Sequence, residues 1–162
     1  MAEDQSYPRV KKFFFLFIFI LSFSKANSEN FTFIKIANLN NPWGSSFLNN
    51  DEMIITEKSG LIKIVNIINN QVNDVEHNLN FLEDGQGGLL DILHQENKVW
   101  ISYTENRGNR KTSTSIALAN LDKKNLVFKN IFQANPPINS GYHFGSRLAI
   151  KDNYLYASAG ER

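Results

Sequence analysis

Short hydrophobic runs, separated by polar turns, follow one another along the chain after residue 29. The runs are rich in Ile, Val, Phe, Tyr and Thr, and they end at Asn, Asp, Gly or Lys-Asn clusters. No window of about a dozen residues holds a helical period of 3.6. The pattern predicts an all-β chain with strands at residues 31–37, 52–56, 61–68, 89–93, 99–104, 115–119, 126–132, 146–150 and 154–158.

The spacing of these strands, roughly 10 residues, is typical of a β-sandwich or a β-propeller. A similar hairpin pattern, a strand followed by an Asn/Lys-Asp-Asn-type turn and another strand, occurs in residues 47–65 and 148–162, and more loosely in 91–104. Recurrence after roughly 45–50 residues is what a four-stranded propeller blade would give. Other hairpin-rich proteins can show the same pattern, so the residues alone leave both folds open.

The N-terminal region has the pattern of a signal peptide. Residues 13–21 are continuously apolar, follow Lys11 and Lys12, and lead to the small residues Ala26 and Ser28. A membrane-spanning helix needs about 20 apolar residues, whereas an apolar region of this length with a basic flank is typical of a secretory signal. We therefore predict a signal peptide at residues 1–28, with an atypical N-terminal extension, and no stable membrane span after cleavage. The alternative is a retained N-terminal anchor.

Composition narrows the range of functions. The chain has 162 residues, of which 42% are hydrophobic and 20% are charged, enough for one globular core. A formal net charge of +1 argues against a nucleic-acid partner, which would require a basic surplus. The absence of cysteine excludes disulfide scaffolds, zinc fingers, iron–sulfur centres and thiol catalysis. An abundance of Asn, Ile, Lys and Phe hints at an AT-rich bacterial genome.

Three segments carry a resemblance to a known family. They are residues 41–44 (NPWG) with 53–60 (MIITEKSG), residues 85–94 (GQGGLLDILH) with 99–103 (VWISY), and residues 143–148 (HFGSRL) with 154–156 (YLY) and 160–162 (GER). In this order and spacing they resemble the soluble PQQ-dependent sugar dehydrogenases, the glucose/sorbosone dehydrogenase family. The resemblance implies a six-bladed β-propeller, of which residues 29–162 would be the N-terminal part, about two to three blades, truncated at the C-terminus.

The resemblance also singles out site residues. Histidine ionises near neutral pH and can accept a proton, and the resemblance implies that His143 is the general base. It places Gln86, in a glycine-rich loop, at the sugar pocket. Tyr142 stands where glucose-oxidising members carry an acidic residue, which leaves the sugar open. From the residues alone, His143 would be an ordinary turn histidine and Gln86 part of a glycine turn. The three histidines have no metal-ligand spacing, so no metal ligands are assigned.

The remaining candidates have structural interpretations. We expect His77 to be solvated in a polar loop and His94 to pack or to cap a turn. We expect Trp43 and Trp100 to lie in blade cores, and Arg147 to be structural, pairing with a nearby carboxylate or with carbonyls.

For the parent protein the resemblance implies an oxidoreductase that converts an aldose or related sugar to a lactone, with hydride transfer to PQQ. PQQ and calcium would be the cofactors, with most of their ligands beyond Arg162, and the fragment itself would be inactive. The partners would be the sugar and a respiratory electron acceptor, and the location periplasmic or secreted, in a bacterium. The alternative is a secreted β-propeller that binds a sugar or a protein without a cofactor, an interpretation that Tyr142 favours. A hydrolytic propeller such as a lactonase would need a metal cluster that does not stand out here.

Overall fold

The computed structural model describes residues 31–161, and the strands belong to a compact unit that begins at Ile34. The predicted signal peptide at residues 1–28 lies outside the described residues. Residues 31–33, which precede the compact unit, form no regular element.

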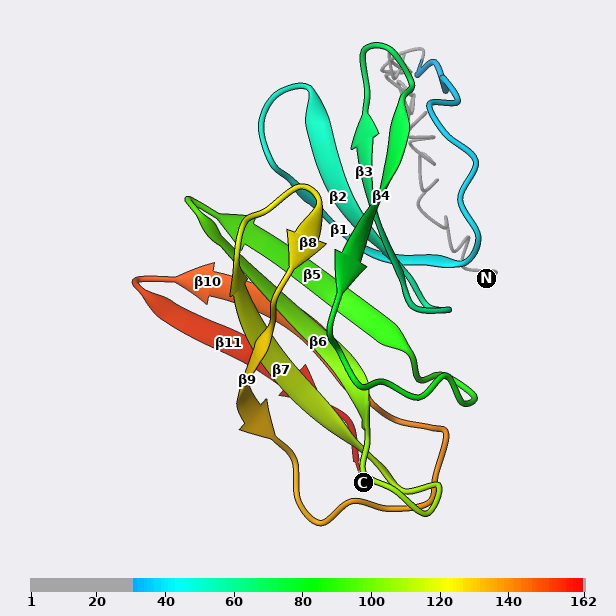
Figure 1. Ribbon diagram of the computed structural model, residues 1–162, viewed down its shortest axis with the longest axis vertical. Coiled ribbons are helices and arrows are strands. Elements are labelled where there is room, and N and C mark those ends of the chain that lie inside the picture. The colour runs from blue at the N-terminus through cyan, green and yellow to red at the C-terminus, as the bar shows by residue number, and fades with distance from the viewer. Residues whose placement is uncertain (1–30, 162) are drawn as a thin grey trace, which may run out of the picture. The chain divides into compact units, whose positions relative to one another are not determined.

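The unit consists of three β-sheets (Figure 1). The first is an antiparallel meander of β1 (Pro42–Phe47), β2 (Glu52–Glu57), β3 (Leu61–Asn66) and β4 (Val72–His77), to which the short β8 (Asn125–Leu126) adds in parallel. The second contains β5 (Leu89–Gln95), β6 (Lys98–Asn106), β7 (Thr112–Asn120) and β9 (Lys129–Gln133). The third is the hairpin β10 (Gly145–Lys151) and β11 (Tyr154–Ala159). Because a four-stranded antiparallel meander is the unit of a propeller, we call these sheets the first, second and third blade.

The three blades begin in the same way. Their first strands, β1, β5 and β10, are neighbours, since β5 contacts both of the others. Each first strand has an irregularity in its pairing with the second strand, at positions 42–45, 89–92 and 145–148. Such bulges increase the local twist and are common next to functional sites.

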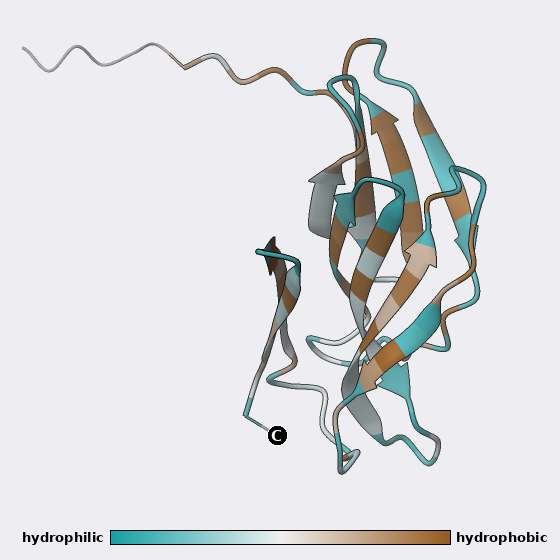
Figure 2. Cartoon of the chain, turned by 90° about the vertical axis from the view of Figure 1, so that its left-hand side faces the viewer, coloured by the Kyte–Doolittle hydropathy of each residue, from teal (hydrophilic) through white to brown (hydrophobic). Residues whose placement is uncertain are grey.

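The hydrophobic core lies between the first and second blades (Figure 2). Ile54 and Ile62 of the first blade and Val99 and Ile101 of the second are almost completely buried. The alternation of these positions along their strands puts one face of each sheet into the core. The chain thus buries its apolar residues by packing sheet against sheet, and the described residues contain no helix.

The all-β prediction is confirmed, but several strand predictions are wrong. Residues 31–37 form no strand, and Phe31 and Phe33 are exposed, because an alternating pattern makes a strand only where a partner strand is available. The strands β1 and β4 were not predicted. In β4 (VNDVEH) only Val75 is fully buried, so its sequence resembles a polar loop. The expected strand at 126–132 is divided between β8 and β9.

Within residues 31–161 we find no helix with the length and hydrophobicity needed to cross a membrane.

Candidate functional site

Two of the predicted site residues meet at one end of the blades. Gln86 lies in the loop before β5 and His143 in the loop before β10. The backbone N–H of His143 donates a hydrogen bond of 3.0 Å to Gln86 Oε1. The backbone N–H of Gln86 donates one of 2.7 Å to the carbonyl of Gly141. The two loops are therefore joined by reciprocal bonds, and residues 57 positions apart share one site.

The side chain of His143 projects from a rare backbone conformation. Its φ of 61° lies in the left-handed region, which residues other than glycine seldom adopt. The glycine of the GER motif explains how this turn is accommodated: a Cβ at Gly160 would overlap the carbonyl oxygen of His143. Since the segment after β11 passes so close to His143, the two parts of the third sequence motif form one structural unit.

Side chains of the second blade anchor the loop before β5 and the loop before β10 through hydrogen bonds. Thr104 Oγ1 on β6 accepts a hydrogen bond of 3.1 Å from the N–H of Gly88, and Thr114 Oγ1 on β7 donates one of 2.9 Å to the carbonyl of Phe144. Both threonines are almost fully buried, as is Phe144. Buried bonds of this kind are costly to break, so the loops have firm anchors directly beside Gln86 and His143.

The side chains that could meet a ligand face solvent. His143 and Gln86 are exposed, and Tyr142 is 60% exposed. These exposed side chains therefore lie on loops whose backbone is fixed by the buried bonds of Thr104 and Thr114. An exposed imidazole beside an amide can exchange a proton with a bound hydroxyl group while the amide forms hydrogen bonds to it.

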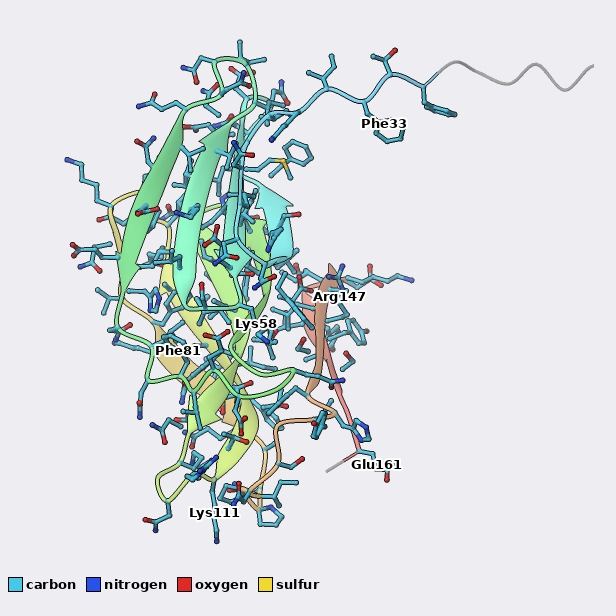
Figure 3. The ribbon with its side chains drawn as sticks, turned by 90° about the vertical axis from the view of Figure 1, so that its right-hand side faces the viewer. Phe33, Lys58, Phe81, Lys111, Arg147 and Glu161 are labelled. Carbon is cyan, nitrogen blue, oxygen red and sulfur yellow. The ribbon has the colours of Figure 1, made fainter. Side chains whose placement is uncertain are left out.

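A lysine that was not assigned a role in the sequence also touches this region. Lys58, in the turn between β2 and β3, donates a hydrogen bond of 2.6 Å from Nζ to the carbonyl of Gly85, next to Gln86 (Figure 3). The N–H of Leu89 donates to the carbonyl of Lys58. Lys58 therefore brings a positive charge to the glycine-rich loop. Its position in the first motif (EKSG) was the available signal.

Arg147 has the structural role expected of it. Its guanidinium lies 3.4 Å from Asp91 Oδ1, and Asp91 Oδ2 accepts a hydrogen bond of 2.8 Å from the N–H of Leu148. Asp91 is only 4% exposed, so the bulge of β5 holds the bulge of β10 through a buried carboxylate. The prediction that Arg147 pairs with a carboxylate is confirmed.

The two other histidines lie away from this site. His77 is in β4, not in a solvated loop, and a ring nitrogen lies 2.8 Å from the carbonyl of Gly60. His94 packs as expected, with Nδ1 3.1 Å from the carbonyl of Phe47. In the described part of the chain, no three His, Asp or Glu side chains are grouped so that they could hold a metal ion.

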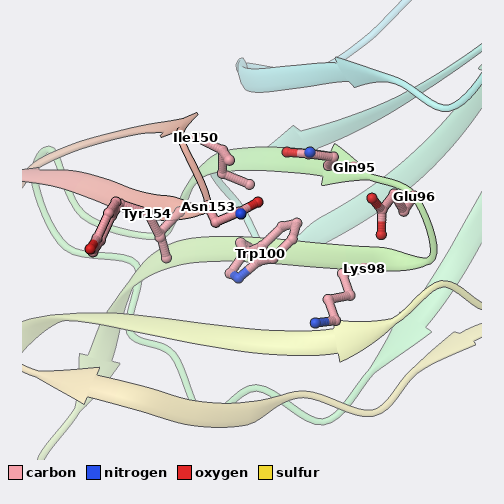
Figure 4. A pocket seen from close by; sticks show the side chains of 8 residues that line it. Gln95, Glu96, Lys98, Trp100, Ile150, Asn153 and Tyr154 are labelled. Atoms are coloured by element: carbon pink, nitrogen blue, oxygen red, sulfur yellow. The ribbon is translucent and has the colours of Figure 1, made fainter.

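A separate hollow of 270 Å³ lies at the other end of the strands, between the β5–β6 and β10–β11 hairpin tips (Figure 4). Trp100 and Asn153 line it, and none of the predicted site residues does. Trp100 is partly buried, and Trp43 is 43% exposed, so the prediction that Trp43 lies in a blade core is wrong. Trp43 lies between Pro42 and Ser45, where the pairing of β1 with β2 is irregular.

Burial raises the pKa of Tyr103 to about 12, and its hydroxyl lies 2.7 Å from Asn130 Oδ1. Tyr103 belongs to the core cluster and stays protonated at neutral pH. It is therefore no competitor of His143 for the role of a base.

Comparison with known proteins supports the sequence resemblance. The family model described as "Glucose / Sorbosone dehydrogenase" matches residues 39–162. The aldose sugar dehydrogenase YliI of Escherichia coli K12 is 29% identical over 133 residues, which are 76% of this chain and 36% of that protein. An uncharacterized protein of Synechocystis is 33% identical over 142 residues, covering 78% of this chain and 34% of its own length. The chain thus spans about a third of the curated relatives it matches.

Solved structures give the same result. A glucose dehydrogenase matches with a TM-score of 0.71 and 28% identity over 76% of this chain and 41% of its own. The apo-form of the soluble aldose sugar dehydrogenase of E. coli matches with a TM-score of 0.69 and 28% identity, over 76% of this chain and 38% of that chain. These neighbours are β-propellers, so the prediction of a partial β-propeller is confirmed.

Proposed function

The chain belongs to the glucose/sorbosone dehydrogenase family, and from this premise we propose that the whole protein oxidises an aldose or a related sugar to its lactone with PQQ as cofactor. The observation that carries the proposal is the hydrogen bond between Gln86 and the backbone of His143, which joins the two motif loops into one exposed site. A PQQ-bound aldose sugar dehydrogenase from Streptomyces coelicolor, 22% identical with a TM-score of 0.66 over 76% of this chain and 39% of its own, has the same fold.

In this proposal each residue has a distinct role. The imidazole of His143 takes the proton from the hydroxyl of the sugar carbon that is oxidised. Gln86 holds the backbone of His143 through Oε1, and among residues 31–161 its amide nitrogen has no hydrogen-bond partner, so it can donate to a sugar oxygen. Tyr142, beside the base, contacts the sugar with its exposed ring and contributes to the choice of substrate.

The described residues fit one side of a quinone site. PQQ, when bound, supplies the redox chemistry by accepting the two electrons that leave the sugar carbon as hydride. Because PQQ carries carboxylates, a positive charge at the rim favours it, and Lys58 is such a charge at the glycine-rich loop. Residues 31–161 contain no group of three or more His, Asp or Glu side chains that could hold a metal ion, and we assign no calcium ligand to them.

The proposed setting follows from the same reasoning. The apolar segment at residues 13–21 predicts export, so we place the protein in the periplasm or outside the cell. The electrons from the sugar would then pass to a respiratory acceptor.

The second candidate is a secreted binding module that holds a sugar without a cofactor. Tyr142 favours it, because an exposed aromatic ring provides a contact surface for a sugar without any chemistry.

One experiment separates the two functions. The whole protein, purified without cofactor, is titrated with PQQ in the presence of calcium, and dye reduction is measured with a panel of aldoses. An enzyme gives a PQQ-dependent spectral change and sugar-dependent dye reduction. A binding module gives neither, although it still binds sugar in calorimetry, and that result would refute the proposed enzyme. We expect residues 1–162 alone to be inactive in this assay.

A further inference from the structure

A hydroxyl side chain recurs at the same place in all three blades. In each blade, regular pairing between the first and second strands resumes after the bulge at one residue pair: Ser45 with Ile55, Ile92 with Ile101, and Leu148 with Ala157. The hydroxyl residue is the next residue of the second strand, which is Thr56, Ser102 or Ser158. The three positions are therefore equivalent in register.

Each hydroxyl oxygen accepts a hydrogen bond from the bulge of its own blade. The donors are the backbone N–H groups of Gly44 to Thr56, Asp91 to Ser102 and Arg147 to Ser158, each at 3.0 Å. These N–H groups lie within the bulges, where regular pairing is interrupted. The hydroxyl thus replaces the missing partner in each blade.

In the first two blades the same hydroxyl also reaches the next blade. Thr56 Oγ1 donates to the carbonyl of Leu90 at 2.5 Å, and Ser102 Oγ donates to the carbonyl of Ser146 at 2.6 Å. Leu90 and Ser146 are equivalent, since each follows the residue that opens its first strand, Leu89 or Gly145. One side chain therefore fastens the first strand of its own blade to the first strand of the following blade.

In the third blade, only the first of these two hydrogen bonds is present among the described residues. Among the described residues, the hydroxyl of Ser158 donates to no acceptor. Thr56 and Ser102 are 0% exposed, whereas Ser158 is exposed. Tyr156, two residues before it, is 54% exposed and occupies the place that Trp100 has in the second blade.

We propose that the face of β11 that carries Tyr156 and Ser158 is the docking surface for a further blade of the same protein, whose first strand offers a backbone carbonyl to the Ser158 hydroxyl. The repeat gives the chemistry of the occupant: an extended strand with a free carbonyl at the position equivalent to Leu90 and Ser146. The lengths of the relatives identify its source, because this chain covers only 36% and 34% of theirs. The inference rests on the fold and not on the proposed activity.

The test compares the thermal unfolding of two proteins, residues 1–162 and the same chain continued through the reading frame that follows codon 162. In the continued protein, Ser158→Ala should lower Tm by about 2–4 °C, as should Ser102→Ala, because each leaves a buried carbonyl without its donor. In residues 1–162, Ser102→Ala should lower Tm by a similar amount and Ser158→Ala by less than about 1 °C. Ser158→Thr, which keeps the hydroxyl, is the matched control and should restore the Tm of the continued protein.

Three results would overturn the proposal. The first is an equal, small effect of Ser158→Ala in both proteins, and the second is a stop codon directly after codon 162. The third is a dimer of residues 1–162 that Ser158→Ala dissociates in sedimentation experiments, which would identify a second copy as the occupant. Ser102→Ala serves as an internal standard, since it shows whether the loss of one hydroxyl bond between blades changes Tm measurably.

Discussion

The site depends most on the backbone of one residue, His143. A φ of 61° is unfavourable for a histidine, so the surrounding contacts must hold it. Gln86 Oε1 accepts its N–H, and Gly160 leaves room for its carbonyl. Gln86 is therefore a positioning residue for the proposed base, in addition to its proposed contact with the sugar.

Replacement of Gln86 tests this positioning role. Gln86→Leu removes the acceptor of the His143 N–H, so amide hydrogen exchange at His143 should become roughly 2- to 10-fold faster. Gln86→Glu keeps an oxygen at that position and should retain most of the protection. Gln71→Leu, in an exposed turn of the first blade, is the control and should have no effect at His143. Unchanged exchange in Gln86→Leu would show that the bond does not hold the loop.

The order of motifs along the chain was enough to predict that His143 and Gln86 share a site. Lys58 lies in the first motif but was missed, because only the fold brings its side chain to the carbonyl of Gly85. The exposure of Trp43 could not be predicted either. A tryptophan in a β-rich chain is usually buried, and the bulge of β1 is not visible in the sequence.

Among the elements, burial in the core explains most of the successful strand predictions, although the exposed hairpin β10–β11 was also predicted from its sequence. The strands β2, β3, β5, β6 and β7 have apolar residues that enter the shared core, so their hydrophobic pattern was a sufficient signal. The strand β4 is held by pairing with β3 and buries one residue, Val75, so its sequence gave little signal. Residues 31–37 alternate well but have no partner strand among the described residues.

An ion pair between elements gives a pH-dependent prediction. Hydrogen bonds from Lys123, in the turn after β7, and from Asn49 lower the pKa of Glu52 on β2 below its ordinary value of 4.5. Because the folded pKa is below the unfolded one, the stabilisation is complete above pH 4.5 and is lost as the pH falls through the folded pKa. Glu52 is partly and Lys123 half exposed, so the contribution is only about 0.5–1 kcal/mol.

Urea unfolding of Glu52→Gln should therefore show a loss of about 0.5–1 kcal/mol at pH 7 that is smaller at pH 3. A double-mutant cycle with Lys123→Met isolates the pair from other effects of either change. A loss that is the same at both pH values would contradict the ionic origin of the effect.

At the scale of the whole molecule, two blades share a core and a third is represented by one hairpin. Beside β11 lies an apolar groove of 410 Å³, lined in part by Ile131 and Phe132, each 50% exposed. Ser158 is among the residues that line this groove, and among the described residues its hydroxyl donates to no acceptor. The hairpin packs against the second blade through β10, whereas β11 is largely exposed and has the character of a strand that other strands cover in a complete propeller.

The central claim, that His143 is the base of a PQQ-dependent sugar dehydrogenase, is tested most directly by the kcat of His143→Ala in the whole protein with PQQ and calcium. We predict a fall in kcat of roughly 10²- to 10⁴-fold, with the sugar still bound, because only proton removal is lost. His77→Ala, which lies on β4 away from both loops, should change kcat by less than about twofold if the protein stays folded. A His143→Ala protein that oxidises aldoses within about tenfold of the wild-type rate would contradict the account.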